Sequence, residues 1–185
     1  IAAANIAAVY QDRVEEQWGG TTDFARIPFK GISLGDTFRL NAKSDIVSKY
    51  FPHNSDRLRD LEQSDIRIIV GNPPYSIGQA SANDKNQNES YPELEERIGE
   101  TYAVKSEATL KKGLYDSYVK AFRWASDRVS NERGGIVAFI SNSGWMDGKG
   151  FAGFRRCIAE EFDKIYVFDL RGNCNTSGER RQKEA

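Results

Sequence analysis

The sequence DIRIIVGNPPY, residues 65–75, decides how the rest of the chain is interpreted. Its first six residues are rich in β-branched side chains and stop at Gly71, which predicts a strand over 65–70. Asn72, Pro73, Pro74 and Tyr75 follow directly, at the carboxyl end of that strand. Open α/β sheets bind their ligands at such strand ends, so the position predicts a ligand-binding loop.

The four residues of this loop suit an aromatic amine. Two consecutive prolines fix φ, remove two backbone donors and leave carbonyl acceptors in set directions. The side-chain oxygen of Asn72 beside the carbonyl of Pro73 forms a pair of acceptors for an NH2 group, and Tyr75 offers a flat face for stacking the ring. The structural alternative is a rigid turn with a packed tyrosine, but a turn alone does not require an Asn and two prolines here.

The pattern around this loop alternates between strands and helices. Further strands are predicted over 30–34, 135–140 and 164–170. Helices are predicted from residue 1 to near Gly19 and over 92–104, 114–129 and 151–162. Because strands separated by helices of about ten or more residues form βαβ crossovers, the fold class is α/β with a doubly wound parallel sheet.

The length of 185 residues predicts a single folding unit over 1–185. The polar stretch 76–92 predicts a mobile surface loop, and 171–185 is a polar, basic tail. The chain opens inside an Ala-rich helical pattern, so we expect it to be part of something longer.

Composition excludes several classes of protein. The chain is 39% hydrophobic and 29% charged, and no apolar run approaches the roughly 18 residues of a membrane span. Its formal charge of -1 means that affinity for polyanions has to come from local patches. Cys157 and Cys174 lack a metal-binding spacing, which predicts reduced thiols in a cytoplasmic protein. His53, the single histidine, argues against a histidine-ligated metal, and no metal is expected.

The Asn-Pro-Pro-Tyr sequence resembles the catalytic motif [DNS]-P-P-[YFW] of the N6-adenine DNA methyltransferases. The resemblance implies a Rossmann-like fold and direct transfer of a methyl group from S-adenosylmethionine to a flipped adenine in DNA, without a covalent intermediate or a metal. In that family's pattern Asn72 and Pro73 would hold the amine, Pro74 would shape the loop, and Tyr75 would stack on the base.

Two further segments resemble the family's cofactor site. In ISLGDTF, residues 32–38, the resemblance implies that Asp36 accepts the amino group of the cofactor's adenine and that the Thr37 backbone faces the same ring. In LYDSYVKAF, residues 114–122, it implies that Tyr118 lines the adenine pocket. Asp36 could instead be a turn residue or cap, and Tyr118 could simply pack in the core.

The family's Gly-rich cofactor loop does not occur in the chain. The methyltransferase sheet is therefore expected to be incomplete, without its first strands and its last strand. We expect the isolated chain to be inactive and to bind S-adenosylmethionine weakly or not at all.

The chain most resembles the methylase region of large single-polypeptide restriction-modification proteins of the type ISP kind. FPHNSDR (51–57), SANDKNQNES (81–90) and SGERRQKE (177–184) carry this likeness. It implies a parent polypeptide with nuclease, helicase and target-recognition domains that acts on nucleoid DNA.

Two other functions stay open: N5-methylation of a protein glutamine, and non-catalytic binding of nucleic acid. Seven basic residues against four acidic ones between Lys105 and Arg133 could follow phosphates, but a solvated helix face explains them equally well.

Overall fold

The computed structural model describes residues 2–18, 31–39, 52–74, 90–130 and 132–170. The chain divides into two compact units, Ile1–Asp65 and Ile66–Ala185, and each is described by itself. Tyr75, Cys174, most of the predicted loop over 76–92 and the tail over 171–185 lie outside the described residues. No helix in the described part of the chain is both long and apolar enough to cross a lipid bilayer.

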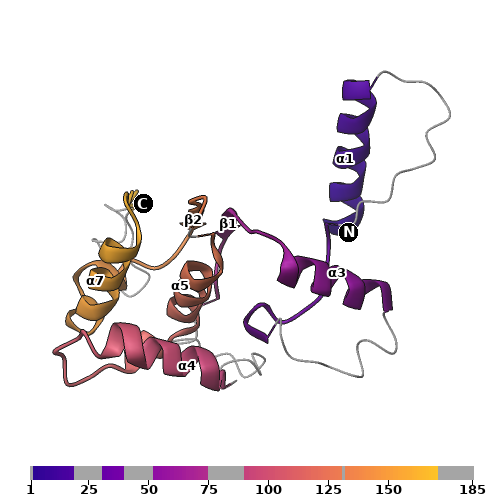
Figure 1. Ribbon diagram of the computed structural model, residues 1–185. Coiled ribbons are helices and arrows are strands. Elements are labelled where there is room, and N and C mark those ends of the chain that lie inside the picture. The colour runs from indigo at the N-terminus through magenta and orange to yellow at the C-terminus, as the bar shows by residue number, and fades with distance from the viewer. Residues whose placement is uncertain (1, 19–30, 40–51, 75–89, 131, 171–185) are drawn as a thin grey trace, which may run out of the picture. The chain divides into compact units, whose positions relative to one another are not determined.

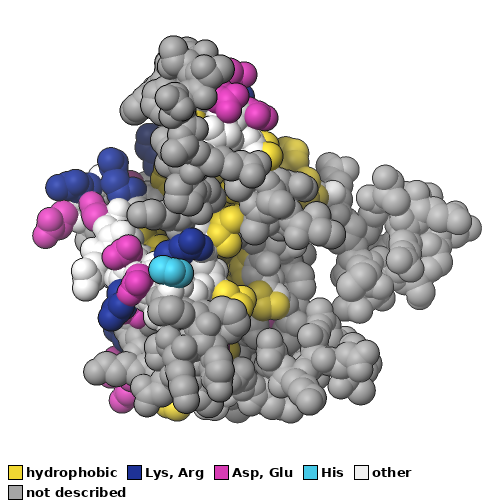
Figure 2. All heavy atoms as spheres, turned by 90° about the vertical axis from the view of Figure 1, so that its right-hand side faces the viewer, with side chains coloured by type: hydrophobic (Ala, Val, Ile, Leu, Met, Phe, Trp, Pro, Cys, Tyr) yellow, Lys and Arg dark blue, Asp and Glu magenta, His cyan; other side chains and the backbone are white. Residues whose placement is uncertain are grey.

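The first unit contains two α-helices in its described residues (Figure 1). α1 (Ala2–Trp18) confirms the helix predicted from the apolar spacing. α3 (Pro52–Gln63) was not predicted, because Leu58 and Leu61 are its only large apolar residues and they give a weak periodic signal. Its first residue is a proline, which suits the first turn because the missing N–H would have no intrahelical partner there. The single histidine, cyan in Figure 2, is exposed on this helix.

The predicted strand over 30–34 is wrong for the residues that are described, because 31–34 form no strand. The Leu34 N–H donates to Oδ1 of Asn54 at 2.7 Å, and the Leu34 carbonyl accepts from Nδ2 of Asn54 at 2.8 Å. The side-chain amide of α3 thus satisfies backbone groups that a neighbouring strand would have satisfied.

The second unit contains a two-stranded parallel sheet, which confirms two of the predicted strands. β1 (Ile68–Gly71) pairs with β2 (Ile136–Phe139), in the register Ile68↔Ile136 through Gly71↔Phe139. The connection between the strands is long and helical, as parallel pairing requires. The unit is therefore a mixed α/β structure, and the wider doubly wound sheet stays a prediction.

Helices predicted for this unit are confirmed with local changes. The helix expected over 92–104 is α4 (Pro92–Ile98) continued by a π-helical turn, η3 (Gly99–Ala103). The helix expected over 114–129 is divided into η4 (Lys112–Tyr115) and α5 (Ser117–Arg128). Asp116 causes the division, because its extended backbone ends η4 and its side chain caps α5 by accepting from the Tyr118 N–H.

A third predicted helix, over 151–162, is α7 (Ala152–Glu161). It is preceded by two short turns that were not predicted, α6 (Gly144–Asp147) and η5 (Lys149–Phe151).

The core of this unit lies between its helices and one face of the sheet. Phe122 of α5 meets Phe139 of β2 and Phe154 of α7 with ring centroids 5.1 and 5.3 Å apart. Tyr102 of η3 meets Phe154 edge-on at 5.0 Å. Edge-to-face aromatic contacts of this kind stabilise the core beyond the burial of apolar surface. They hold α5 against β2 and against α7.

The predicted strand over 164–170 is also wrong, because these described residues form no strand. Tyr166 and Phe168 are each 86% exposed. A β-strand needs a neighbouring strand for its backbone hydrogen bonds, and no strand in the described part of the chain pairs with this segment. An apolar pattern alone is therefore not sufficient to form a strand.

Candidate functional site

The candidate amine site begins where the two parallel strands end. The Gly71 carbonyl accepts a hydrogen bond from the Ile140 N–H at 3.0 Å, so strand pairing continues up to the residue before Asn72. A Cβ on Gly71 would lie 3.4 Å from the Phe139 ring, in van der Waals contact with it. The close packing of β1 on β2 therefore fixes the backbone from which the loop departs.

Within the loop, Pro73 is buried, whereas Asn72 and Pro74 are exposed. The Asn72 side chain forms no hydrogen bond with any other residue that the structure describes. The exposed Asn72 side chain thus lies at the carboxyl end of β1, next to a buried proline. This arrangement can accept hydrogen bonds from a ligand, because an Asn side chain has one acceptor oxygen and the proline carbonyl offers another.

The connection that starts at Asn72 rejoins the described residues just before α4. There Lys120 Nζ donates to Glu95 Oε1 at 2.6 Å and lies 5.4 Å from the centre of the Tyr91 ring. The Tyr91 N–H also donates to Glu95 Oε1, at 3.3 Å. The hydrogen bond from Lys120 lowers the pKa of Glu95 below its ordinary value. We call Lys120, Glu95 and Tyr91 the α4 anchor.

Asp36 and Thr37 belong to the first unit, and both are exposed. Asp36 Oδ1 accepts from the Phe38 N–H at 3.0 Å, so Asp36 caps the short helix η1 (Thr37–Arg39). This capping role is the structural alternative to cofactor binding that the sequence analysis left open for Asp36. A carboxylate has about four lone-pair sites, so accepting one backbone N–H does not prevent it from accepting an amino group as well.

Tyr118 lies in the second unit and is 2% exposed. It belongs to the buried cluster that includes Ile98, Leu114 and Val119, and its ring centroid is 6.3 Å from that of Phe151. These contacts match the core-packing alternative.

At least three of the seven basic residues of the segment 105–133 are engaged in ion pairs. Lys105 pairs with Glu160, and Lys120 pairs with Glu95. Arg123 is 2% exposed and pairs with Glu161 and with Asp127, in each case at 2.8 Å. These three cations stabilise contacts between helices, which leaves fewer charges for phosphates than the sequence indicates.

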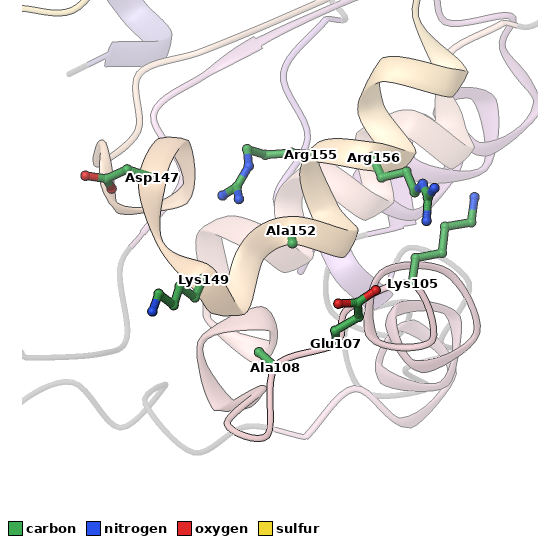
Figure 3. A pocket seen from close by; sticks show the side chains of 8 residues that line it. All are labelled: Lys105, Glu107, Ala108, Asp147, Lys149, Ala152, Arg155 and Arg156. Atoms are coloured by element: carbon green, nitrogen blue, oxygen red, sulfur yellow. The ribbon is translucent and has the colours of Figure 1, made fainter.

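A pocket of about 600 Å³ lies on the second unit and was not predicted (Figure 3). It is lined by charged and small side chains from separate segments: Lys105, Glu107, Ala108, Asp147, Lys149, Ala152, Arg155 and Arg156. Arg155 Nη1 donates to the carbonyls of Trp145 at 2.7 Å and Gly148 at 2.9 Å. Three of its four cations are already bonded within the protein, because Lys105 and Arg156 both pair with Glu160. No single local motif could have indicated this pocket, because its lining comes from two segments, 105–108 and 147–156, that are distant in sequence.

Among the described residues, no three His, Cys, Asp or Glu side chains are grouped so as to hold a metal ion. Cys157 is buried, and its Sγ donates to the Thr101 carbonyl at 3.4 Å. Burial raises the pKa of this thiol, which disfavours the nucleophilic thiolate. Neither observation offers a second catalytic centre in the described parts of the two units.

Comparison with known proteins gives consistent matches. The family model described as Eco57I restriction-modification methylase matches residues 10–175. A nuclease-deletion mutant of the Type ISP restriction-modification enzyme LlaGI, solved in complex with a DNA substrate mimic, is 39% identical with a TM-score of 0.81, and the match covers 100% of this chain and 16% of that one. No curated protein matches the chain.

Two more solved structures are similar. The DrdV–DNA complex is 40% identical with a TM-score of 0.79, over 98% of this chain and 16% of that one. The ATP-dependent Type ISP restriction-modification enzyme LlaBIII bound to DNA is 35% identical with a TM-score of 0.80, over 98% and 12%. The chain thus spans less than a fifth of the length of each of these proteins.

Proposed function

Because the chain belongs to the Eco57I restriction-modification methylase family, we propose that it forms part of the catalytic domain of an adenine-specific DNA methyltransferase. The reaction would move a methyl group from S-adenosylmethionine to the N6 amino group of adenine. The chain would act within a longer restriction-modification polypeptide that binds DNA and carries nuclease, helicase and target-recognition domains in the cytoplasm. Its similarity to a short part of large proteins solved with DNA supports this context.

The observation that carries the proposal is the loop at the end of β1. Asn72 is exposed and Pro73 is buried, immediately after a strand whose last carbonyl is paired with β2. The Asn72 side-chain oxygen and the Pro73 carbonyl would accept the two N6 hydrogens of a flipped adenine. These hydrogen bonds would orient the amine and leave lone-pair density on nitrogen. Tyr75, three residues along the chain, would stack on the base and Pro74 would hold the loop's shape.

S-adenosylmethionine supplies an electrophilic methyl carbon on its sulfonium. Methylation of the amine held by Asn72 and Pro73 would release S-adenosylhomocysteine, and one N6 proton would pass to water. Asn72 and Pro73 favour this change because acceptors aimed at the amine stabilise the positive charge that develops on it. No described side chain is needed as a covalent nucleophile.

Asp36 and Thr37 fit the adenine of this cofactor. An exposed carboxylate can accept the adenine amino group, and the exposed Thr37 backbone adjoins it. We therefore propose both residues as cofactor contacts. The 2% exposure of Tyr118 supports core packing, and we propose no cofactor contact for it.

The test uses the complete polypeptide with tritiated S-adenosylmethionine, offered duplex DNA and protein in parallel. We expect label in DNA, recovered as N6-methyladenine. Replacing Asn72→Ala should lower kcat about 100-fold or more, because an acceptor for the reacting amine is lost. The control is Gln11→Ala, which removes another side-chain amide, one that is bonded to Glu15, and should leave kcat unchanged.

Two outcomes would contradict the proposal. Label in protein glutamine and none in DNA would indicate the glutamine-methylating alternative. DNA binding without transfer to any acceptor, unaffected by Asn72→Ala, would indicate a non-catalytic binding module.

A further inference from the structure

In the first unit, one face of α3 holds the segment 31–39 in place. Asn54 exchanges two hydrogen bonds with the backbone of Leu34, at 2.7 and 2.8 Å. Arg57 Nη1 donates to the Ile32 carbonyl at 2.9 Å. Residues 54, 57 and 58 are spaced i, i+3 and i+4, so they share one face of the helix.

Leu58, the third residue on this face, lies against Gly35. A Cβ added to Gly35 would come within 2.9 Å of Leu58 Cδ2, so the backbone approaches the helix closely there. We call Asn54, Arg57 and Leu58 the α3 clamp. It contacts residues 32, 34 and 35, and Asp36 follows directly.

The α3 clamp replaces a sheet as the source of order in this segment. Residues 31–34 form no strand, so side chains of α3 satisfy the backbone of Ile32 and Leu34. Arg57 is half-buried, which strengthens its hydrogen bond to the carbonyl. The position of the Asp36 carboxylate and of the η1 turn then depends on where α3 holds the preceding residues.

We propose that Asn54 and Arg57 are positioning residues for the cofactor: by fixing residues 32–35 they set the affinity of Asp36 and Thr37 for S-adenosylmethionine. This inference rests on the proposed function. Neither side chain would touch the reacting atoms, so they act through the preorganisation of the segment. Losing the clamp should raise the KM for S-adenosylmethionine, while kcat at saturation and the KM for DNA stay unchanged.

The experiment compares Asn54→Ala and Arg57→Met with the wild type in the complete polypeptide. Each variant should raise the KM for S-adenosylmethionine about tenfold, because one or two hydrogen bonds that order the segment are lost. Arg59→Met is the matched control, since Arg59 is on the same helix, is 67% exposed and pairs with Asp56. It should leave all three kinetic constants unchanged.

Conservative variants separate positioning from a general loss of structure. Asn54→Asp keeps an acceptor for the Leu34 N–H but loses the donor to its carbonyl, so its KM should lie between those of the wild type and Asn54→Ala. Arg57→Lys keeps a cationic donor and should recover part of the affinity. These two variants also carry the test if Asn54→Ala does not fold, as judged by its thermal melting.

An unchanged KM for S-adenosylmethionine in the folded variants would overturn the inference. A fall in kcat with that KM unchanged would overturn it too. Direct calorimetric titration with S-adenosylmethionine distinguishes a failure of the positioning role from a failure of the proposed methyltransferase function. If the wild type binds the cofactor and the variants bind it equally well, the clamp has no such role. If the wild type binds it but methylates no adenine, the proposed reaction fails instead.

Discussion

At the residue scale, the α4 anchor fixes the point where the connection from Asn72 re-enters the described structure. The Lys120 side chain is 9% exposed and that of Glu95 is 32% exposed, so the pair is largely removed from water. A charge-assisted hydrogen bond in such surroundings is stronger than an exposed one. Its effect is to hold the first turn of α4 against α5.

Glu95 makes the stability of this region depend on pH. Its pKa is lowered in the folded state, chiefly by the hydrogen bond from Lys120. The stabilisation is therefore present above the unfolded pKa, near 4.5, and is lost as the pH falls through the lower folded value. We expect the free energy of opening of α4, measured by hydrogen exchange in the complete polypeptide, to fall below about pH 4.5.

Lys120→Met should remove this dependence, because methionine keeps an apolar stem but not the charge. It should also lower the opening free energy of α4 at pH 7 by about 1–2 kcal/mol. Lys149→Met, which removes an exposed cation, is the control. An α4 whose pH profile is the same in the wild type and in Lys120→Met would contradict this role of the anchor.

At the element scale, α7 packs on the π-helical turn η3 without space for a side chain. A Cβ on Gly153 would lie 1.9 Å from the Tyr102 carbonyl oxygen and 2.8 Å from the Ser106 nitrogen. Both are backbone atoms, so relief requires one element to move. Gly153 is needed here for close approach rather than for an unusual backbone conformation.

Gly153→Ala should therefore destabilise the contact between α7 and η3 by about 3 kcal/mol or more, as overpacking of a core does. Gly99→Ala is the matched control, because Gly99 has helical dihedral angles and its Cβ would meet only the Tyr115 hydroxyl, at 3.8 Å. That control should be neutral or stabilising by about 0.5–1 kcal/mol. Hydrogen exchange of α7 measures the effect of each substitution. Equal effects of Gly153→Ala and Gly99→Ala would show that the close approach of α7 to η3 does not cause the destabilisation.

Among larger contacts, one arginine joins several helices of the second unit. Arg123 of α5 makes two hydrogen bonds to Glu161 of α7, at 2.8 and 3.1 Å, and lies 5.2 Å from the centre of the Tyr102 ring of η3. Asp127, which it also contacts, accepts from Arg97 of α4. Burial disfavours the charged form of Arg123, but the hydrogen bonds that it donates to Glu161 and the nearby charges of Asp127 and Glu161 outweigh this effect, so its pKa is raised and it stays charged.

Arg123→Met should lower the free energy of unfolding of this unit by about 3 kcal/mol. This is the low end for a buried pair, because the Glu161 and Asp127 side chains are each 33% exposed and keep part of their hydration. A double-mutant cycle with Glu161→Gln, followed by hydrogen exchange of α5 and α7, should give a coupling of about 1–3 kcal/mol. Additive effects would mean that the pair contributes no specific energy.

At the scale of the whole molecule, the two-stranded sheet leaves one face uncovered within the described residues. Ile68, Val70 and Ile136 are 59–74% exposed on that face, whereas Phe139 on the other face packs against Phe122. The near-continuous apolar runs of both strands are typical of parallel strands that are covered on both faces. They agree with the predicted wider doubly wound sheet, in which β1 and β2 would be two of the strands.

The sequence determined the elements whose signals are local. Apolar spacing located α1 and α5, Pro92 marked the start of α4, apolar runs located β1 and β2, and Gly71 followed by two prolines located the candidate amine loop. These signals suffice because helical hydrogen bonds join residues four apart and because prolines act on their own backbone.

Only the tertiary structure decided which apolar segments become strands and which charges are buried. The segments 31–34 and 164–170 have strand-like composition but form no strand, since a ladder needs a partner that composition does not specify. Asn54 was not singled out by sequence, because its partner Leu34 is 20 residues away. Arg123 is on a helix that could equally have been solvated, and its burial follows from carboxylates 4 and 38 residues distant. Contacts between residues far apart in sequence are fixed by packing, which local periodicity does not encode.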